Sequence, residues 1–472
     1  MTDELCFRAA GELARMIRAR EVSAREVVAA HIERIEEVNP ALNAVVQLTA
    51  EQALRDADEA DRKLAAGEEA GPLHGVPFTV KDNIPVAGVI MTNGTLGLKD
   101  YVPDEDATVV TRLKQAGGIV IGKTNLPEIG MAGITDNLVY GRTNNPYDLD
   151  RTPGGSSGGE SAIIAAGGSP LGIGTDIGGS IRYPAHCCGI AGIKPTMGRI
   201  PWHVPYGYTD ELRQSGPMAR TVADLSLALP LMSGPHWRDP SAPPAPLGEP
   251  ADVDVRALRV AVHTDNGVMA PRADVARAVM EAVDALRERG VDVVEDRPAE
   301  LAASLDLFGR LLGASGGQQY RDALEAAGTR ADQISPPIRE FLDVVAKRAV
   351  TTAEFQRIIL EWDQYRSALW GFFERYDAIL CPISPGPAPL HEGEPNDPRG
   401  LSFAAAFNLG GLPGTVVRAG TSDEGLPIGV QIVARAWRED VSLALAAAIE
   451  DALGGWQPPQ IAAPEAAGTP AS

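Results

Sequence analysis

The 472-residue sequence is poor in positive charge, and several classes of function depend on such charge. Lys and Arg number 42 against 63 Asp and Glu, which gives a formal net charge of −21 at pH 7. Nucleic-acid backbones and anionic membrane surfaces both select clustered Lys and Arg, so we expect binding to neither. Gly, Pro or a charge also interrupts every apolar run before it reaches the roughly 18 residues of a membrane-spanning helix.

Cysteine is scarce as well. The four residues Cys6, Cys187, Cys188 and Cys381 have no CxxC spacing, and an adjacent pair is a poor framework for either zinc or disulfides. The first ten residues, MTDELCFRAA, lack the basic start and apolar stretch of a signal peptide. The sequence therefore predicts a cytoplasmic protein with no metal and no cofactor.

What is present indicates a globular α/β protein, with 44% apolar and 22% charged residues. The first 65 or so residues have helical periodicity, and Ser23 with Glu26 forms a predicted capping box. From Pro72 the segments HGVPFTVKDN, ATVVTRLKQAGG and IVIGKTN follow one another as strand, helix and strand.

Strand-like segments recur late in the chain, as DAILCPIS, TVVRAG and PIGVQIVAR, so the sheet is expected to draw on both ends of the sequence. This predicts a single large domain over residues 1–460 rather than two independent halves. Its expected parts are a helical flank (1–68), a core (70–232), a Pro-rich connection (234–256), and a helix-rich insert with sheet completion (257–455). Residues 461–472 carry too little apolar pattern to pack and are predicted to be a disordered tail.

Glycine is very dense between residues 151 and 195, which invites a phosphate-binding interpretation. The loop GGSSGGES, however, lacks the lysine of a P-loop. The segment GIGTDI at 172–177 has isoleucine where a dinucleotide fingerprint requires its third glycine. Both nucleotide templates therefore fail.

A second interpretation is a nucleophile elbow, because GGSSG at 154–158 matches G-x-S-x-G and would make Ser156 the nucleophile. An elbow follows a buried strand directly, whereas the preceding NNPYDLDRTP has the chemistry of a turn. This interpretation also needs a histidine base from later in the chain. The candidates are His186, His203, His236, His263 and His391.

A different serine has a better local context. Ser180 follows the apolar strand LGIGTD and the pair Gly178-Gly179, where backbone N–H groups can converge on a carbonyl oxygen as an oxyanion hole. The alternative is a tight turn in which Ser180 caps a helix. Lys81 ends the apolar strand FTV in a chain with only seven lysines, and it could act as a base if burial keeps it partly neutral.

The run GGSSGGESAIIAAGGSPLGIGTDIGGSIRYPAHCCGIAGIKPTMGRI closely resembles the signature of the amidase signature family. HGVPFTVKDN, IGKTNLPEIG and GLPIGVQIVAR resemble its flanking segments, so the likeness covers most of the chain. Lys81 and Ser156 are 75 residues apart, and Ser156 and Ser180 are 24 apart, as the family's triad leads one to expect. The implied fold is a mixed, twisted central β-sheet flanked on both faces by α-helices.

Carried over by position, the resemblance implies that Ser180 is the nucleophile, Ser156 the bridging serine after a cis peptide bond, and Lys81 the base. It implies an oxyanion hole of Ile177, Gly178, Gly179 and Ser180, supported by Ser157, Asp176 and Arg182. It places substrate against Met131, Ala132, Gly133, Ile134, Tyr140 and the segment after the signature, with Trp202 and Tyr206. In a chain with 5% aromatics these rings suggest an apolar or aryl-lined pocket, and ordinary loop packing is the alternative.

The implied activity is hydrolysis of the C–N bond of carboxylic amides, apolar or aryl ones in particular, through an acyl-enzyme. Two alternatives share the signature. One is a carbamate (urethane) or ester hydrolase with the same triad, and the other is the glutamine-hydrolysing subunit of a tRNA-dependent amidotransferase. The expected partner is a small-molecule amide or carbamate, and the expected assembly is a monomer or homodimer.

Overall fold

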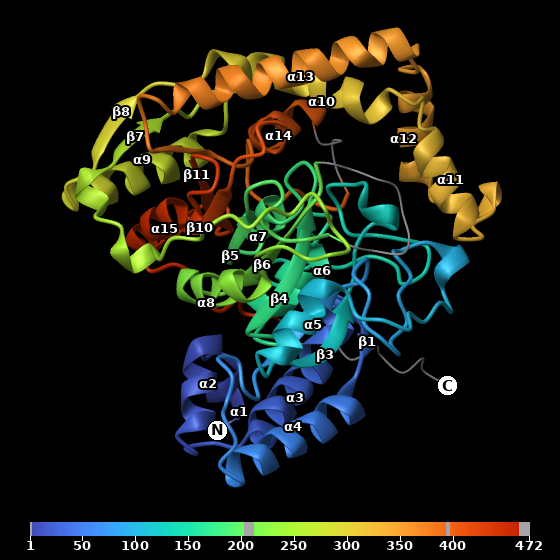
Figure 1. The fold of residues 1–472 in the computed structure, drawn as a ribbon, viewed down its shortest axis with the longest axis vertical. Helices are drawn as coiled ribbons and strands as arrows, with labels where there is room; N and C mark the ends of the chain where they lie inside the picture. Colours follow the sequence, from blue (N-terminus) through green and yellow to red (C-terminus); the bar gives the residue numbers. More distant parts are fainter. Residues whose placement is uncertain (1, 203–211, 393–396, 462–472) are drawn as a thin grey trace, which may run out of the picture.

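The computed structural model describes residues 2–202, 212–392 and 397–461 (Figure 1). Within them, eleven strands form one sheet. The strands are β1 (Val45–Leu48), β2 (Pro77–Lys81), β3 (Ile119–Thr124), β4 (Leu171–Asp176), β5 (Ala191–Lys194), β6 (Gln214–Ala219), β7 (Arg259–Val262), β8 (Asp292–Glu295), β9 (Ala378–Pro382), β10 (Gly414–Thr421) and β11 (Pro427–Ala434). Their order across the sheet is β1-β3-β2-β4-β6-β5-β10-β11-β9-β7-β8.

The helices come from every part of the described chain. In the N-terminal part they are α1 (Thr2–Cys6), α2 (Ala10–Arg18), α3 (Ala24–Leu42), α4 (Ala50–Ala65), α5 (Thr108–Gln115), α6 (Gly158–Ala165), α7 (Arg182–Cys187) and α8 (Val222–Met232). Later come α9 (Ala273–Glu288), α10 (Ser304–Gly313), α11 (Gln318–Ala326), α12 (Pro336–Ala346), α13 (Thr352–Phe372), α14 (Ser402–Leu409) and α15 (Glu439–Leu453). Across the described ranges, none of them is both long and apolar enough to cross a bilayer.

The sheet is mixed and joins the two ends of the chain, which confirms the predicted single α/β domain. β2 pairs in parallel with β3 and β4, and β7 pairs in parallel with β8 and β9. The seam between the early and late parts is antiparallel, with Gly414 of β10 opposite Lys194 of β5. Removing the C-terminal strands would expose the edge of β5.

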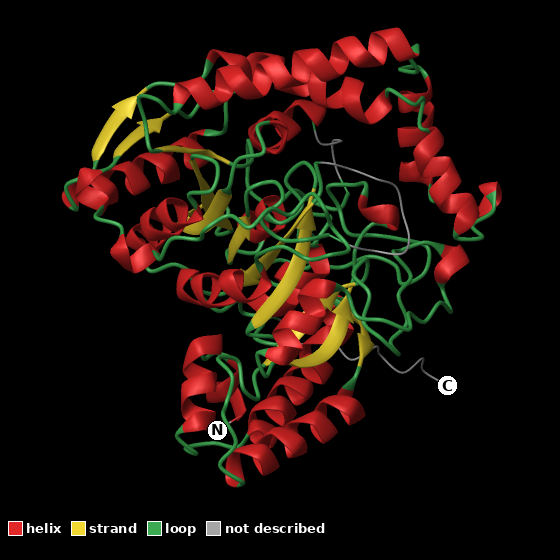
Figure 2. Ribbon diagram, viewed as in Figure 1, coloured by secondary structure: helices red, strands yellow, loops and turns green. Residues whose placement is uncertain are grey.

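Helices cover both faces of the sheet (Figure 2). Successive residues of a strand point to opposite faces. Val416 of β10 packs in an apolar cluster with residues of α6 and α7, whereas its neighbour Val417 packs in the main cluster with residues of α8, α9 and α15. Each face of the sheet thus carries its own apolar core.

The N-terminal flank is helical as predicted, with one exception. Ser23 Oγ accepts the N–H of Glu26, and the Glu26 carboxylate accepts the N–H of Ser23, so the predicted capping box begins α3. Within the same flank, however, VVQL forms β1, which pairs antiparallel with β3. Asn43 ends α3 in a left-handed conformation and redirects the chain toward that sheet edge.

The predicted helix-rich insert consists of α10 to α13, and Figure 1 shows it arching over one end of the sheet. Phe308 of α10 packs with Trp362 and Leu369 of α13 in a cluster that also contains Phe407 and Leu409 of α14. The insert is thereby anchored next to the segments that follow β4 and β9. Apart from Ile461, the predicted tail lies outside the described residues.

Candidate active site

Lys81 enters the interior of the protein from the end of β2. All five residues of β2 are buried, and the side chain of Lys81 has no exposed surface. Its Nζ donates to Ser156 Oγ at 2.6 Å and to Ser157 Oγ at 2.9 Å, and it lies 2.9 Å from Thr175 Oγ1. Among the described residues, no carboxylate forms an ion pair with this lysine.

The surroundings of Lys81 favour its neutral form. Burial lowers the pKa of Lys81 well below its ordinary value of 10.5, because the interior solvates a charged ammonium poorly. The positive charge of Arg213 lowers this pKa further, and the negative charges of Asp176 and Glu160 oppose the shift. A lysine in this setting can accept a proton from a hydroxyl group.

Ser156 lies at the start of the segment that leads into α6. The peptide bond between Gly155 and Ser156 is cis, as the family resemblance implied. Ser156 Oγ is in contact with Lys81 Nζ on one side. On another side lies Gly130, which lines a large cavity: a Cβ built on Gly130 would be 3.6 Å from Ser156 Oγ. Ser156 therefore lies between the buried lysine and the cavity wall.

Ser180 lies in the turn after β4 and lines the same cavity. Its carbonyl oxygen accepts the N–H of Ser157 at 3.1 Å, which joins this turn to the Ser156 segment. Gly179 has φ +126°, and a Cβ there would come within 2.7 Å of the Ala404 Cβ, so the turn requires glycine. Within the described part of the chain, no hydrogen bond joins Ser156 Oγ to Ser180 Oγ.

One of the four predicted oxyanion-hole donors is already engaged. The N–H of Gly179 donates to Asp176 Oδ1 at 2.7 Å, because the carboxylate closes the turn that follows β4. Within the described residues, the N–H groups of Ile177, Gly178 and Ser180 have no acceptor. The geometry leaves these three donors for a substrate oxygen.

Asp176 and Arg182 form a fully buried ion pair beneath this turn. Arg182 Nε lies 3.0 Å from Asp176 Oδ2, and Asn408 Nδ2 donates to Asp176 Oδ1 at 2.9 Å. Burial alone would raise the pKa of Asp176, but the Arg182 charge holds it well below its ordinary value. Arg182 also donates to Gln431 of β11, so residues of the late strands help to hold the turn.

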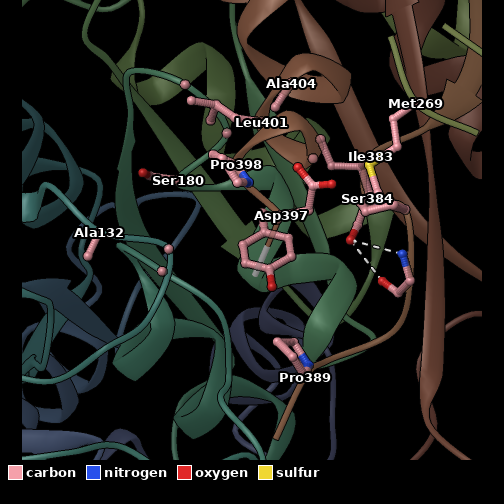
Figure 3. A pocket seen from close by; sticks show the side chains of 18 of the residues that line it. Ala132, Ser180, Met269, Ile383, Ser384, Pro389, Asp397, Pro398, Leu401 and Ala404 are labelled. Atoms are coloured by element: carbon pink, nitrogen blue, oxygen red, sulfur yellow. Dashed lines mark hydrogen bonds between the residues drawn. The ribbon is translucent and has the colours of Figure 1, made fainter. Parts of the chain in front are cut away.

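A cavity of about 770 Å³ opens in front of Ser180. Figure 3 shows Ser180 and Ala132 on one side of it and Met269, Ile383 and Ser384 on the opposite side. Its wall is largely apolar, and the large apolar side chains in it include Met131, Met269, Phe308, Phe341, Ile383 and Leu401. Such a lining suits a hydrophobic substrate of moderate size.

The structure brings only some of the predicted substrate-binding residues to this cavity. Met131, Ala132 and Gly133 line it, whereas Ile134 does not. Tyr140 is also placed elsewhere, because its hydroxyl accepts a hydrogen bond from Gln47 near β1.

Trp202 is also not among the described residues that line the cavity. Its backbone N–H donates to Asp239, and its ring packs against the main apolar core under the guanidinium of Arg213. Ordinary loop packing therefore accounts for Trp202. The predicted Tyr206 lies outside the described residues.

The far wall of the cavity was missed by sequence reasoning. Phe308 and Leu312 come from α10, and Phe341 comes from α12, all within the insert. The helical periodicity of the insert predicts an apolar face on each helix but not the cavity that this face borders. Ile383 and Leu401 lie next to β9 and α14, and no local motif marks them.

The histidines do not support the elbow interpretation. The residues before Ser156 form turns and isolated bridges at Asn145 and Arg151, not the strand that an elbow requires. The buried ring of His186 bonds instead to the backbone of Gly429 and Gly386. His203 lies outside the described ranges, and in the rest of the chain no histidine hydrogen-bonds to Ser156. The described residues also contain no group of His, Cys, Asp and Glu placed to hold a metal.

Comparison with known proteins finds relatives over nearly the whole chain. The amidase family model matches residues 26–443. The chain is 38% identical to the indoleacetamide hydrolase of Bradyrhizobium diazoefficiens, over 94% of this chain and 86% of that protein. It is 34% identical to a glutamyl-tRNA(Gln) amidotransferase subunit of Carboxydothermus hydrogenoformans, over 95% of this chain and 97% of that protein. Among solved structures, the substrate complex of 6-aminohexanoate cyclic dimer hydrolase has a TM-score of 0.85 at 31% identity, covering 95% of this chain and 97% of that one.

Proposed function

The chain belongs to the amidase family of hydrolases that act on C–N bonds other than peptide bonds, and on that premise we propose that Lys81, Ser156 and Ser180 cleave apolar or aryl carboxylic amides. One observation carries this proposal. The buried Lys81 Nζ lies 2.6 Å from Ser156 Oγ, beside a cavity that Ser180 lines. A neutral amine against a hydroxyl is the arrangement that a serine relay needs.

In the proposed first half-reaction, neutral Lys81 accepts the proton of Ser156, and Ser156 Oγ takes the proton of Ser180. Ser180 Oγ then attacks the substrate carbonyl carbon. The N–H groups of Ile177, Gly178 and Ser180 stabilise the resulting oxyanion, and a well-placed donor typically contributes about 3–4 kcal/mol. Ser156 Oγ and Ser180 Oγ share no hydrogen bond within the described residues, so we expect the bound substrate to align the two hydroxyls.

The second half-reaction reverses this relay. Protonated Lys81 returns its proton through Ser156 to the leaving nitrogen, the C–N bond breaks, and Ser180 keeps the acyl group as an ester. A water molecule then gives a proton to the same relay and attacks the ester carbonyl. This step releases the acid and restores Ser180.

The preference for apolar or aryl amides rests on the cavity lining. Phe308, Phe341 and Met131 offer apolar and aromatic surface close to the turn that carries Ser180. One of the relatives is named as an indoleacetamide hydrolase, which is consistent with an aryl substrate. Carbamates and esters present the same carbonyl to the relay, so they are the comparison substrates in the assay below.

The amidotransferase relatives suggest glutamine as another substrate. The cavity argues against it, because glutamine is small and polar whereas most of the surface that lines this cavity is apolar. The expected result is a hydrolase that is active without any partner protein and has higher kcat/KM for acyl anilides than for glutamine or short aliphatic amides. A clear preference for glutamine would contradict the proposed substrate class.

The triad is tested with Ser180→Ala and Lys81→Ala, assayed on a chromogenic anilide beside an equivalent carbamate and ester. Each substitution is expected to lower kcat by at least about 10³-fold, because it removes the nucleophile or the base. His186→Asn and His391→Asn are the controls and should keep turnover. Full turnover in Ser180→Ala, or loss of turnover only in a histidine variant, would favour the elbow mechanism instead.

A further inference from the structure

A second carboxylate is built into the layer that holds Lys81. Glu160, in the first turn of α6, is completely buried, and its two oxygens accept the hydroxyls of Thr79 and Thr124. The Thr124 hydroxyl lies 2.5 Å from Glu160 Oε2. A Cβ on Gly172 of β4 would come within 1.6 Å of Glu160 Oε1, so the strand leaves room for this carboxyl group only because it has glycine there.

The same elements position Lys81. Thr79 lies two residues before Lys81 on β2, so their side chains share one face of the strand. Thr124 is the residue of β3 that lies opposite Lys81 in the parallel register. Glu160 is therefore held by hydroxyls from the two strands that carry and flank the lysine.

The charges around Lys81 single out Glu160. Asp176 is neutralised by Arg182 at 3.0 Å, and Lys123 lies 3.3 Å from Asp82, so these four groups form two compact ion pairs. Glu160 accepts hydrogen bonds from neutral hydroxyls and forms no ion pair among the described residues. Arg213 is the remaining charge that acts on Lys81, and it has the same sign as the ammonium.

We propose that Glu160 is a positioning residue for the reaction, whose carboxylate acts through space on Lys81 as the counter-charge of its protonated form. The inference rests on the proposed role of Lys81 as the base. When Lys81 takes the proton of Ser156, Glu160 stabilises the ammonium that forms. The position of α6 in the fold favours this, because a carboxylate in the first turn of a helix lies near the positive end of the helix dipole.

The electrostatic balance around Glu160 agrees with this role. Burial raises the pKa of Glu160 to about 7, and the hydroxyls of Thr124 and Thr79 and the charges of Lys81 and Lys123 oppose that rise. Glu160 in turn raises the pKa of Lys81. As the Glu160 carboxyl group ionises with rising pH, the Lys81 ammonium becomes harder to deprotonate. The acid limb of the pH–activity profile is therefore expected to be broader than the titration of a single group.

The test is the pH profile of kcat/KM on a chromogenic anilide for wild type and Glu160→Gln. Glutamine keeps the shape of the side chain but has no charge. The midpoint of the acid limb is expected to move to lower pH by about half to one unit, and the limb should sharpen to a single titration. Glu450→Gln is the matched control. Burial also raises the pKa of Glu450 to about 7, but Glu450 lies on α15, where its carboxylate accepts the N–H of Val222 at the start of α8.

An unmoved midpoint in Glu160→Gln, or a shift to higher pH, would overturn the proposal, as would an equal shift in Glu450→Gln. If Glu160→Gln does not fold, Thr124→Val tests the proposal in its place. This substitution removes one hydroxyl that favours the charged form of Glu160. The midpoint of the acid limb is expected to shift in the same direction as in Glu160→Gln, by a smaller amount. Lys81→Arg distinguishes failure of the proposed base from failure of the Glu160 proposal alone. Retained turnover in Lys81→Arg would contradict both roles. Lost turnover in Lys81→Arg, together with an unmoved midpoint in Glu160→Gln, would contradict only the role of Glu160.

Discussion

At the scale of single residues, the contacts of three buried lysines distinguish their roles. Lys81, Lys123 and Lys194 are all fully buried. Lys123 lies 3.3 Å from Asp82, and Lys194 donates to the carbonyl oxygen of Pro195, whereas Lys81 contacts serine and threonine hydroxyls. Burial also lowers the pKa of Lys194 to about 7, so a lowered pKa by itself would not identify the base. The Ser156 hydroxyl, 2.6 Å from the Nζ of Lys81, is what supports Lys81 as the proposed base.

Lys81→Arg tests whether the lysine works as a base or only as a positive charge. Arginine keeps the charge but stays protonated at all relevant pH values, so it cannot accept the Ser156 proton. We expect kcat on an anilide to fall by at least about 10³-fold, as in Lys81→Ala. Lys347→Arg, on an exposed lysine, is the control for the chemical change. Activity within about tenfold of wild type would mean that charge alone is sufficient.

The family resemblance predicted that Lys81 and Ser156 lie together, but not every contact around them. Lys81 and Ser156 are 75 residues apart in sequence and 2.6 Å apart in the structure. The engagement of the Gly179 N–H by Asp176 was not predictable, because it depends on the conformation of one turn. The packing of Trp202 on the core was not predictable either, because an aromatic residue after the signature can pack on the core as well as face a substrate.

At the scale of secondary-structure elements, α10 forms a wall directly over the turn that carries Ser180. A Cβ on Gly178 would come within 2.9 Å of Phe308 Cζ and 3.4 Å of Leu401 Cδ1. The insert and the segment before α14 therefore limit the space above Gly178, whose N–H is one donor of the proposed oxyanion hole. The size of acyl group that fits there is expected to depend on Phe308.

A double-mutant cycle on Gly178 and Phe308 tests this limit. Gly178→Ala is expected to lower kcat/KM by about 10- to 100-fold, because the new methyl group forces the ring or the turn to move. Phe308→Ala should favour bulkier anilides and, in the double variant, should recover part of the loss. Leu360→Ala, on the exposed side of α13, is the control and should leave kcat/KM unchanged. Additive losses in the cycle would show that the two positions act independently.

Most elements were predictable from periodicity and caps, as α3 and its Ser23 capping box illustrate. β1 was not, because four residues inside a helical region carry too short a pattern, and pairing with β3 decides their conformation. The insert helices were predictable as helices. Their packing against α14 depends on contacts between distant segments, which one sequence does not reveal.

At the scale of the whole molecule, the site depends on both ends of the chain. β5 and β10 join the early and late strands, and Gln431 of β11 and Asn408 of α14 hold the Arg182–Asp176 pair below the Ser180 turn. This arrangement explains why the single-domain prediction succeeded. Strand segments late in the sequence complete the same sheet that β1 to β6 begin.

The buried Glu450 of α15 is expected to make the stability of the protein depend on pH. Burial raises the pKa of Glu450 from 4.5 to about 7, so the folded protein holds this proton more tightly than the unfolded chain. The resulting stabilisation is complete below pH 4.5 and is lost as pH rises through 7.

From pH 5 to pH 8 the free energy of unfolding of wild type should therefore fall by about 1–3 kcal/mol relative to Glu450→Gln. Urea unfolding of both proteins at the two pH values measures this difference. Glu249→Gln, on an exposed glutamate, is the control and should show no such change. A pH-independent difference between wild type and Glu450→Gln would contradict the raised pKa.

The assignment of the nucleophile is tested most directly by mapping the covalent intermediate. The protein is incubated with an activated ester or phosphonate that forms a stable serine adduct, and the labelled peptide is identified by mass spectrometry. Ser180 lines the cavity while Ser156 lies behind it against Lys81, so the label is expected on Ser180 in wild type and should be absent in Ser180→Ala. A label on Ser156 in wild type would contradict the proposed relay and restore the elbow mechanism.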